Sequence, residues 1–327
     1  MDLSTNYMGL KLANPLIVSS SGLTNSVSKV RKIAENGAGA VVLKSLFEEQ
    51  IIADRHKLET QTDMYFWYPD AVEFVNNFTK DQGIEAYLDL IKGCKDSVDI
   101  PVIASINCIT PKEWPAFAEK IEEAGADGLE LNISIMPFGK EIESHDIENS
   151  YYSIVKEVKK YLDIPVSVKL SFYFSNIYLT VKRLHDAGAK GVVLFNRFYR
   201  PDVDVNNLSL ATRNVFSSHD EITLSLRWIG LLSKKIGIDF AGNTGIHSGA
   251  DIVKQILVGA SSAQVCTAIY RHGFEFIGTM LDEMVAWMRK FGYSNLDQFR
   301  GLLSKDDEAT AEFERVQFMK RAAGKFE

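Results

Sequence analysis

Eight short apolar runs recur along this chain, with amphipathic stretches between them. Each run is rich in β-branched residues or leucine and is apolar on both faces. Strands of this composition are typical of a parallel sheet that is covered on both sides. The runs are Leu16–Val18, Ala40–Leu43, Val102–Ser105, Gly128–Ile133, Val166–Leu170, Val192–Phe195, Asp239–Ala241 and Ala263–Thr267.

Helical patterns occupy the intervals between the runs. They cover Ser26–Asn36, Ile84–Lys95, Pro111–Ala124, Tyr151–Leu162, Tyr178–Ala187, Leu224–Lys235, Ala250–Leu257 and Phe274–Phe291. Four of these patterns end close to a glycine, at Gly37, Gly125, Gly188 and Gly259. Glycine there predicts the left-handed residue that commonly follows a helix. The recurrence marks a repeated β-α unit.

We therefore predict an α/β protein with a (β/α)8 TIM barrel, formed as one domain over residues 1–327. The alternative is a doubly wound open sheet. The barrel is favoured because there are eight strands and because no Gly-x-Gly-x-x-Gly segment follows the first one. The connections 46–82 and 197–221 are long, and we expect both to be insertions on the active-site face. The aromatic run Tyr65–Asp70 in the first insertion has two alternative roles, as a cap on the barrel or as a dimer contact.

Composition narrows the possible partners. The net charge of −7 and the pI near 5.5 argue against broad binding to nucleic acid or anionic membranes. The three cysteines have no spacing that indicates a disulfide framework or a metal site, so we expect no metal. The N-terminus lacks the pattern of a secretory signal, and no run of 18 apolar residues predicts a membrane span. We expect a cytoplasmic protein.

Every predicted strand ends in polar residues. In order along the chain they are Ser19–Gly22, Lys44–Ser45, Asn107–Cys108, Asn132 with Ser134, Lys169 with Ser171, Asn196–Arg197, Gly242–Gly245 and Cys266–Thr267. In a barrel these positions meet at one rim, where functional residues lie. Lysines and amides gathered there are costly unless a ligand satisfies them, so we predict a ligand rich in carbonyls, ring nitrogens and phosphate. The alternative is that the lysines extend to water and the amides hold loops.

The last two strand ends indicate a phosphate site. Gly242-Asn243-Thr244-Gly245 ends the seventh run, and a helix opens at His247-Ser248-Gly249. Thr267 follows the eighth run. Backbone N–H groups of these loops, together with a helix N-terminus, commonly bind phosphate in barrels.

The chain resembles the dihydroorotate dehydrogenases in collinear order from about residue 2 to residue 303. The matching segments are Asn14-Pro15-Leu16-Ile17, Ser20-Ser21-Gly22, Val42-Leu43-Lys44-Ser45, Glu130-Leu131-Asn132-Ile133-Ser134, Val168-Lys169-Leu170, Gly242-Asn243-Thr244-Gly245-Ile246 and Val265-Cys266-Thr267-Ala268-Ile269. Pro137-Phe138-Gly139-Lys140 resembles the soluble class of that family. The resemblance implies a homodimeric FMN-dependent oxidoreductase of pyrimidine metabolism that transfers hydride between a CH–CH bond and flavin N5.

The resemblance also implies roles for individual residues. Ser20, Ser21, Gly22, Lys44, Ser45, Asn132 and Lys169 would line the flavin, and Gly242, Asn243, Thr244, Gly245 and Thr267 would hold its phosphate. The expected substrate residues are Lys44, Asn132, Asn196 and Arg197, and the candidate catalytic residues are Lys44 and Ser134. A lysine near flavin N1 stabilises the negative charge that reduction places there.

One departure from the family concerns the proton acceptor. Soluble members carry a catalytic cysteine just after the Asn-x-Ser segment, whereas this chain has Ile135 or Met136 there. Neither side chain takes a proton, so Ser134, Cys108 and His145 are the candidate replacements. The true substrate and the electron acceptor stay open.

A second departure is Arg197, which stands where a small residue is usual. It is a candidate for binding an anionic group; the alternative is an ion pair with Asp202 or Asp204. Two other hypotheses stay open for the chain as a whole. One is a catalytically silent flavin-binding protein. The other is a non-redox lyase or isomerase in which Lys44 or Lys169 forms a Schiff base.

Overall fold

The computed structural model describes residues 1–48, 83–108, 115–135, 143–198, 201–211 and 215–304. Eight parallel strands form a closed barrel in the order β4-β3-β13-β12-β9-β8-β7-β6, and the pairing of β4 with β6 closes the ring. The barrel strands are β3 (Leu16–Val18), β4 (Ala40–Val42), β6 (Val102–Cys108), β7 (Gly128–Ile133), β8 (Val166–Leu170), β9 (Gly191–Leu194), β12 (Asp239–Asn243) and β13 (Ser262–Val265). The predicted α/β barrel is therefore confirmed, and each of the eight apolar runs forms one of its strands.

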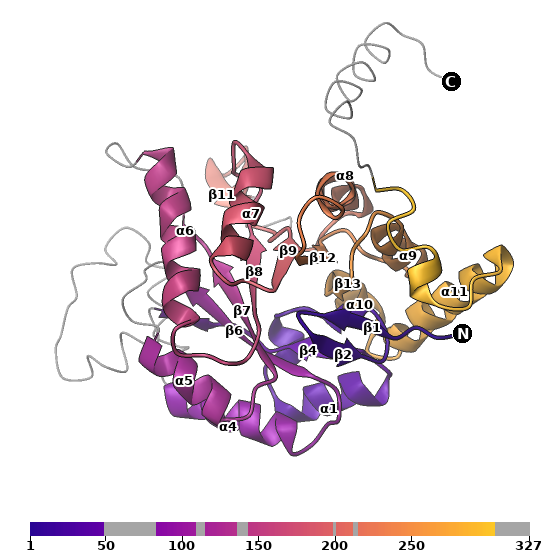
Figure 1. Ribbon diagram of the computed structural model, residues 1–327, viewed down its shortest axis with the longest axis horizontal. Coiled ribbons are helices and arrows are strands. Elements are labelled where there is room, and N and C mark those ends of the chain that lie inside the picture. Colours follow the sequence, from indigo (N-terminus) through magenta and orange to yellow (C-terminus); the bar gives the residue numbers. More distant parts are fainter. Residues whose placement is uncertain (49–82, 109–114, 136–142, 199–200, 212–214, 305–327) are drawn as a thin grey trace, which may run out of the picture.

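Helices surround the barrel on the outside (Figure 1). They are α1 (Val27–Glu35), α4 (Ile84–Lys95), α5 (Pro115–Glu123), α6 (Ser144–Val158), α7 (Ile177–Asp186), α8 (Ile222–Leu232), α9 (Gly249–Leu257), α10 (Thr267–His272) and α11 (Phe276–Phe291). Three short 3₁₀ helices are η1 (Gly22–Thr24), η2 (His219–Glu221) and η3 (Leu296–Gln298). The glycines predicted after four helices all have positive φ, from +88° to +110°.

A hairpin that the sequence analysis did not predict closes one end of the barrel. Its strands β1 (Thr5–Tyr7) and β2 (Leu10–Leu12) are antiparallel, and they lie at the centre of Figure 1. Tyr7 and Met8 are buried there against interior residues of the barrel strands. A Cβ on Gly191 would lie 2.8 Å from Met8 Cγ, so glycine at the start of β9 makes room for the hairpin.

Hydrogen bonds attach this hairpin to the barrel. Asp239 Oδ2 accepts from Met8 N at 2.8 Å, and its Oδ1 accepts from Ser261 Oγ at 2.7 Å. Thr5 Oγ1 donates to the carbonyl of Ser261 at 2.9 Å, and Arg300 donates to Thr5 Oγ1 at 2.8 Å. The hairpin is therefore a fixed part of the barrel.

Three further short strands lie in the long connections. β5 (Leu46–Phe47) extends the sheet beside β6, whereas residues 49–82, with the aromatic run Tyr65–Asp70, lie outside the described residues. In the second connection, β10 (Asp202–Asp204) and β11 (Ser209–Ala211) form an antiparallel hairpin.

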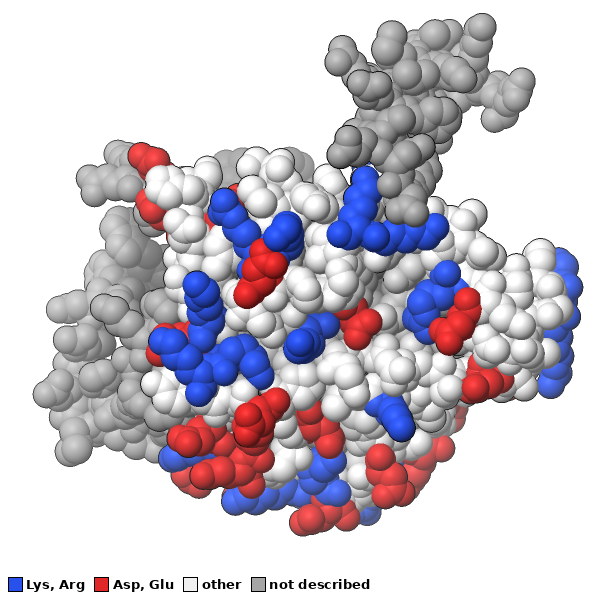
Figure 2. Space-filling view, in the orientation of Figure 1, with Lys and Arg blue, Asp and Glu red and all other residues white. Residues whose placement is uncertain are grey.

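The face seen in Figure 2 carries charges of both signs. Acidic and basic side chains are interspersed over it, and acidic ones gather along its lower edge, over α1 and α4. No helix among the described residues is long and apolar enough to cross a membrane.

Candidate functional site

One cavity opens at the rim where the barrel strands end. It has a volume of about 190 Å³. Eight of the predicted site residues line it: Ser20, Lys169, Asn196, Arg197, Asn243, Thr244, Gly245 and Thr267. It is also lined by six residues that were not predicted as site residues: Ser19, Val215, Ser217, Ile246, Gln264 and Cys266. The predicted rim therefore contains a real cavity with a mixed set of cationic, amide and hydroxyl groups.

Lys169 on β8 supplies a buried cation to this cavity. Its Nζ donates to Gln264 Oε1 at 2.8 Å and to Ser19 Oγ at 3.0 Å, and it lies 3.3 Å from Glu130 Oε1. Gln264 Nε2 in turn donates to Glu130 Oε2 at 2.5 Å. The Lys169 and Glu130 side chains are only 5% and 1% exposed. This network holds the ammonium in one place.

Glu130 and Gln264 are site residues that the sequence analysis missed. The available signal was a polar residue inside an apolar run: Glu130 is the third residue of β7, and Gln264 lies between Ala263 and Val265. Such a residue in a strand covered on both faces needs a partner inside the barrel.

The loop after β12 forms another part of the cavity wall. Asn243 Nδ2 and Thr244 Oγ1 both donate to the carbonyl of Phe195, at 2.7 and 3.0 Å. Thr244 has a φ of +72° and Gly245 a φ of +78°. These contacts fix the backbone of the segment that we predicted to hold phosphate.

Ser217 and Thr267 meet at this end of the cavity. Thr267 Oγ1 accepts from Ser217 N at 3.2 Å and from Ser217 Oγ at 3.1 Å. Ser217 Oγ also lies 3.2 Å from His247 Nε2. Burial lowers the pKa of His247, and the charge of Arg271 lowers it further. Ser217 belongs to the 197–221 insertion, which therefore does reach the site.

The backbone N–H groups at the start of α9, which the sequence suggested for binding phosphate, already have partners within the protein. Gly249 N donates to Glu283 Oε2 at 2.6 Å, and Asp251 N donates to Ser248 Oγ at 3.3 Å. His247 N donates to the buried carboxylate of Asp251 at 3.0 Å. Side chains of the protein thus satisfy these N–H groups, and the Gly245 and Thr267 segments are the better candidates for holding phosphate.

Lys44 and Ser45 line a different hollow, of about 390 Å³, between α1 and α4. Burial lowers the pKa of Lys44, and the nearby charge of Lys29 adds to the effect. Ser45 Oγ lies 3.1 Å from Ser20 Oγ and 2.7 Å from Ser105 Oγ, so a line of hydroxyls joins the two hollows. The two lysines predicted at one rim therefore line separate hollows.

Four other predicted residues lie beside the cavity and do not line it. Ser21 caps η1 by accepting from Leu23 N at 3.2 Å, and a Cβ on Gly22 would lie 2.7 Å from the Tyr270 hydroxyl. Gly242 packs against Gln255, and Asn132 contacts Asn196.

Two polar pairs involve the expected substrate residues. Asn196 Nδ2 donates to Asn132 Oδ1 at 2.9 Å, which brings the two predicted amides together. Arg197 Nε donates to Glu221 Oε2 at 3.0 Å, with the two side chains 17% and 9% exposed. The ion pair considered for Arg197 therefore exists, but its partner is Glu221 and not Asp202 or Asp204.

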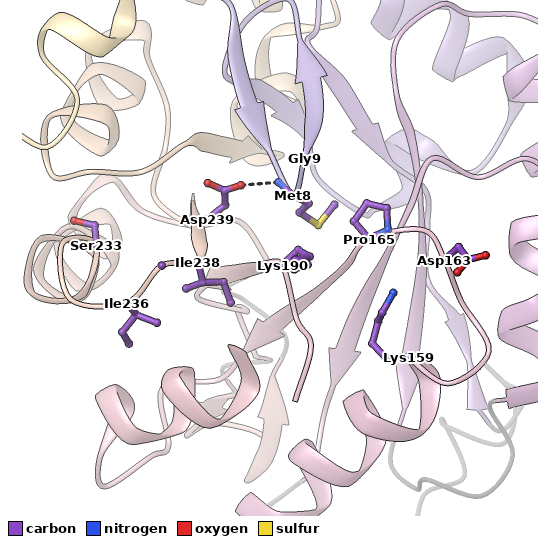
Figure 3. A pocket seen from close by; sticks show the side chains of 11 residues that line it. Met8, Gly9, Lys159, Asp163, Pro165, Lys190, Ser233, Ile236, Ile238 and Asp239 are labelled. Atoms are coloured by element: carbon purple, nitrogen blue, oxygen red, sulfur yellow. Dashed lines mark hydrogen bonds between the residues drawn. The ribbon is translucent and has the colours of Figure 1, made fainter. Parts of the chain in front are cut away.

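A third hollow, of about 680 Å³, lies on the N-terminal hairpin side of the molecule (Figure 3). Lys159 Nζ donates there to the carbonyls of Leu162 and Ile164, and Asp239 holds Met8. These groups are used in holding the fold together. The cavity at Lys169 is the candidate site.

The model of the dihydroorotate dehydrogenase family matches residues 2–288. The chain belongs to this family. It is 31% identical over 309 residues to the catalytic subunit of dihydroorotate dehydrogenase B (NAD(+)) from Pyrococcus abyssi, covering 93% of this chain and 99% of that protein. Subunits of the same description from Pyrococcus furiosus and Thermoplasma volcanium are 30% and 28% identical. These alignments also cover 93% of this chain, and 100% and 99% of the relatives.

Membership makes the chain an oxidoreductase of the dihydroorotate dehydrogenase family, acting on a CH–CH group. The end of β7 is the part of the site where this chain departs from the residues expected for that family. Ile135 or Met136 stands where the resemblance predicts a cysteine; Ile135 is partly buried and packs against the apolar core, and Met136 lies outside the described residues.

The proposed replacements for that cysteine have different surroundings. Ser134 follows β7 directly and is partly buried. His145 is 64% exposed and pairs with Glu143 and Asp146 on the surface, so it does not reach the cavity. The Cys108 side chain lies outside the described part of the chain.

Proposed function

We propose that this chain is an FMN-dependent oxidoreductase that transfers hydride between a CH–CH or C=C bond of a small planar substrate and flavin N5. The observation that carries the proposal is the buried ammonium of Lys169 in the wall of a rim cavity. The part of the wall formed by Gly245 and Thr267 has backbone and hydroxyl groups of the kind that bind phosphate. This donor set fits FMN, which has a polar ring at one end and a phosphate at the other.

When bound, FMN supplies the acceptor or donor of the hydride. The residues of the chain hold and orient the reactants. Lys169 would lie near the pyrimidine side of the flavin ring, and Ser20 would contact the ring edge. Gly242, Asn243, Thr244 and Gly245, together with Thr267, would hold the phosphate, with Ser21, Gly22 and Ser45 supporting the flavin wall. Asn196 lines the cavity and donates to Asn132, and its amide would contact a planar, imide-like substrate.

The proton acceptor is the part of the proposal that differs from the family. Two groups are candidates: the Ser134 hydroxyl, and the Lys44 amine, which lines the adjoining hollow and whose pKa is lowered by burial. Arg197 forms an ion pair with Glu221, and the negative charge of Glu221 weakens the attraction of Arg197 for an anionic substrate. Dihydroorotate is therefore one candidate substrate, and a different unsaturated ring compound is the other.

Ile135 favours a second candidate function. Ile135 is one of the two residues that can occupy the usual base position, and its apolar side chain packs against the core, so a catalytically silent flavin-binding protein is the alternative. A Schiff base on Lys169 has less support, since a charged lysine beside a carboxylate is a poor nucleophile.

We also propose a partner protein that exchanges electrons with the flavin. The relatives are described as catalytic subunits of an NAD(+)-linked enzyme. An iron–sulfur cluster is ordinarily held by four cysteines, and this chain has only three. Electrons therefore need a carrier outside this chain.

A homodimer is the third part of the proposal, and the β10–β11 hairpin is its candidate contact. Val205, Leu208 and Leu210 are 74%, 89% and 74% exposed. Isolated two-stranded hairpins are only marginally stable, and clustered apolar side chains on a surface mark interaction sites. A second copy would offer the same hairpin across a two-fold axis.

Replacing both Leu208 and Leu210 by aspartate is expected to convert the dimer to a monomer, because two charges would be buried at the contact. Sedimentation velocity at micromolar concentration measures this change. Leu303→Asp is the control, since Leu303 is exposed elsewhere on the molecule. A double variant that sediments as the wild type does would remove the hairpin from the interface.

The function is tested by an anaerobic visible spectrum of the purified protein before and after adding dihydroorotate. We expect a flavin band near about 450 nm. Bleaching by dihydroorotate would identify the substrate. A band that only dithionite bleaches would favour another substrate or the silent flavin binder. A protein without a flavin band, and unable to take up added FMN, would overturn the proposal.

A further inference from the structure

Glu130 is a buried carboxylate to which the proposed function gives no role. It lies on β7, inside the barrel, and its side chain is 1% exposed. One of its oxygens is 3.3 Å from Lys169 Nζ, and the other accepts from Gln264 Nε2. Lys169 and Gln264 line the rim cavity, whereas Glu130 does not, so the carboxylate lies behind the cavity wall.

Among the described residues, the ionisable groups whose pKa values respond to the charge of Glu130 or Lys169 are Tyr7, Tyr87 and Cys266. Tyr7 lies deeper inside, and burial together with the charge of Glu130 raises its pKa well above the usual value. Cys266 is on the cavity side; burial raises the pKa of its thiol, and the charge of Lys169 opposes that effect. Asp239 is bonded to Met8 at the closed end of the barrel. Glu130 is therefore the anion in direct contact with Lys169.

We propose that Glu130 is a positioning residue that holds the Lys169 ammonium against the cavity and sets how readily a flavin there is reduced. This inference rests on the proposed function. Two-electron reduction with uptake of one proton at N5 leaves a negative charge at flavin N1. A cation beside that charge favours the reduced form, and an anion behind the cation partly cancels the effect. The carboxylate thus fixes the lysine and also weakens its electrostatic effect on the flavin.

The test is the midpoint potential of the flavin in Glu130→Gln, measured anaerobically at pH 6.5 by equilibration with a reference dye. The amide keeps the shape of the side chain and the contact with Gln264 but removes the negative charge. We expect reduction to be favoured at least tenfold, which is about 30 mV more positive for a two-electron couple. Glu130→Asp keeps the charge and is expected to stay close to the wild-type potential.

Ser167→Ala is the matched control. Ser167 is a buried polar residue of the same barrel interior, two positions before Lys169 on β8. Its loss changes no charge, so the potential should stay at the wild-type value. An unchanged or lower potential in Glu130→Gln would overturn the inference.

A second measurement tests the counter-ion role without flavin. The flavin-free Glu130→Gln chain is unfolded in urea from pH 6.5 to pH 9. A buried ammonium without its carboxylate loses its proton on folding, so the unfolded state binds more protons and the free energy of unfolding should rise with pH relative to the wild type. Parallel pH profiles for both proteins would overturn the inference. If the wild type takes up no FMN, the proposed function fails while this profile still decides whether Glu130 is the counter-ion.

Discussion

Lys169→Met is expected to lower the free energy of unfolding by about 3–5 kcal/mol, the usual cost of leaving a buried charge without its partner. The buried Glu130 carboxylate would then keep only the hydrogen bond from Gln264 Nε2, among the residues that the structure describes. Urea unfolding at pH 7 measures the change. We also expect the variant to retain FMN poorly, since Lys169 lines the cavity.

Two controls distinguish the cost of leaving a buried charge unpaired from the cost of removing a lysine anywhere on the protein. Lys182→Met removes a cation that pairs with Asp186 on the surface, and exposed pairs contribute at most about 1 kcal/mol. Combining Lys169→Met with Glu130→Gln removes both buried charges and should restore more than half of the loss. If the double variant is as unstable as Lys169→Met alone, the charge pair is not the cause.

Gly245→Ala is expected to be the second damaging change. Its φ of +78° costs an alanine roughly 1–2 kcal/mol. The added Cβ would lie 2.3 Å from the backbone nitrogen of Ile222, and overpacking costs about 1–3 kcal/mol more. Because Gly245 lines the cavity, we expect weaker FMN retention as well, measured by equilibrium dialysis with flavin fluorescence.

Gly292→Ala is the matched control for this prediction. Gly292 has a φ of +76°, but nothing lies within 4 Å of the position of an added Cβ. The free energy of unfolding of this variant should therefore fall only by the cost of the left-handed backbone, and the variant should keep its flavin. Equal losses of stability in the two variants would show that the contact with Ile222 is unimportant.

The periodic parts of the fold were predictable because burial on both faces leaves a clear pattern. Each of the eight apolar runs is a barrel strand, and α4 has the predicted bounds. The hairpin of β1 and β2 was missed because each strand has only three residues, too few for an alternating pattern. Its position follows from contacts with distant residues such as Gly191 and Asp239, which the local sequence does not reveal.

The location of the site at the barrel rim was predictable from the sequence, but the contacts between its side chains were not. Lys44 and Lys169 both stand at strand ends, yet Lys169 is within β8 whereas β4 stops at Val42. Beyond that point strand alternation no longer fixes where a side chain lies. The pairing of Arg197 with Glu221 joins the two ends of a long connection, and only the path of the chain between them decides it.

The hairpin that closes the barrel floor has a kinetic consequence. With Tyr7 and Met8 filling that end, the deep cavity wall at Lys169 is reached from the rim. A substrate and an electron carrier that both approach the proposed flavin from this rim would then compete for the same opening. Reactants that compete for one opening bind one after the other, so the first product leaves before the second reactant binds. Steady-state kinetics of the double-displacement type, with parallel lines in reciprocal plots, is the behaviour that this architecture favours.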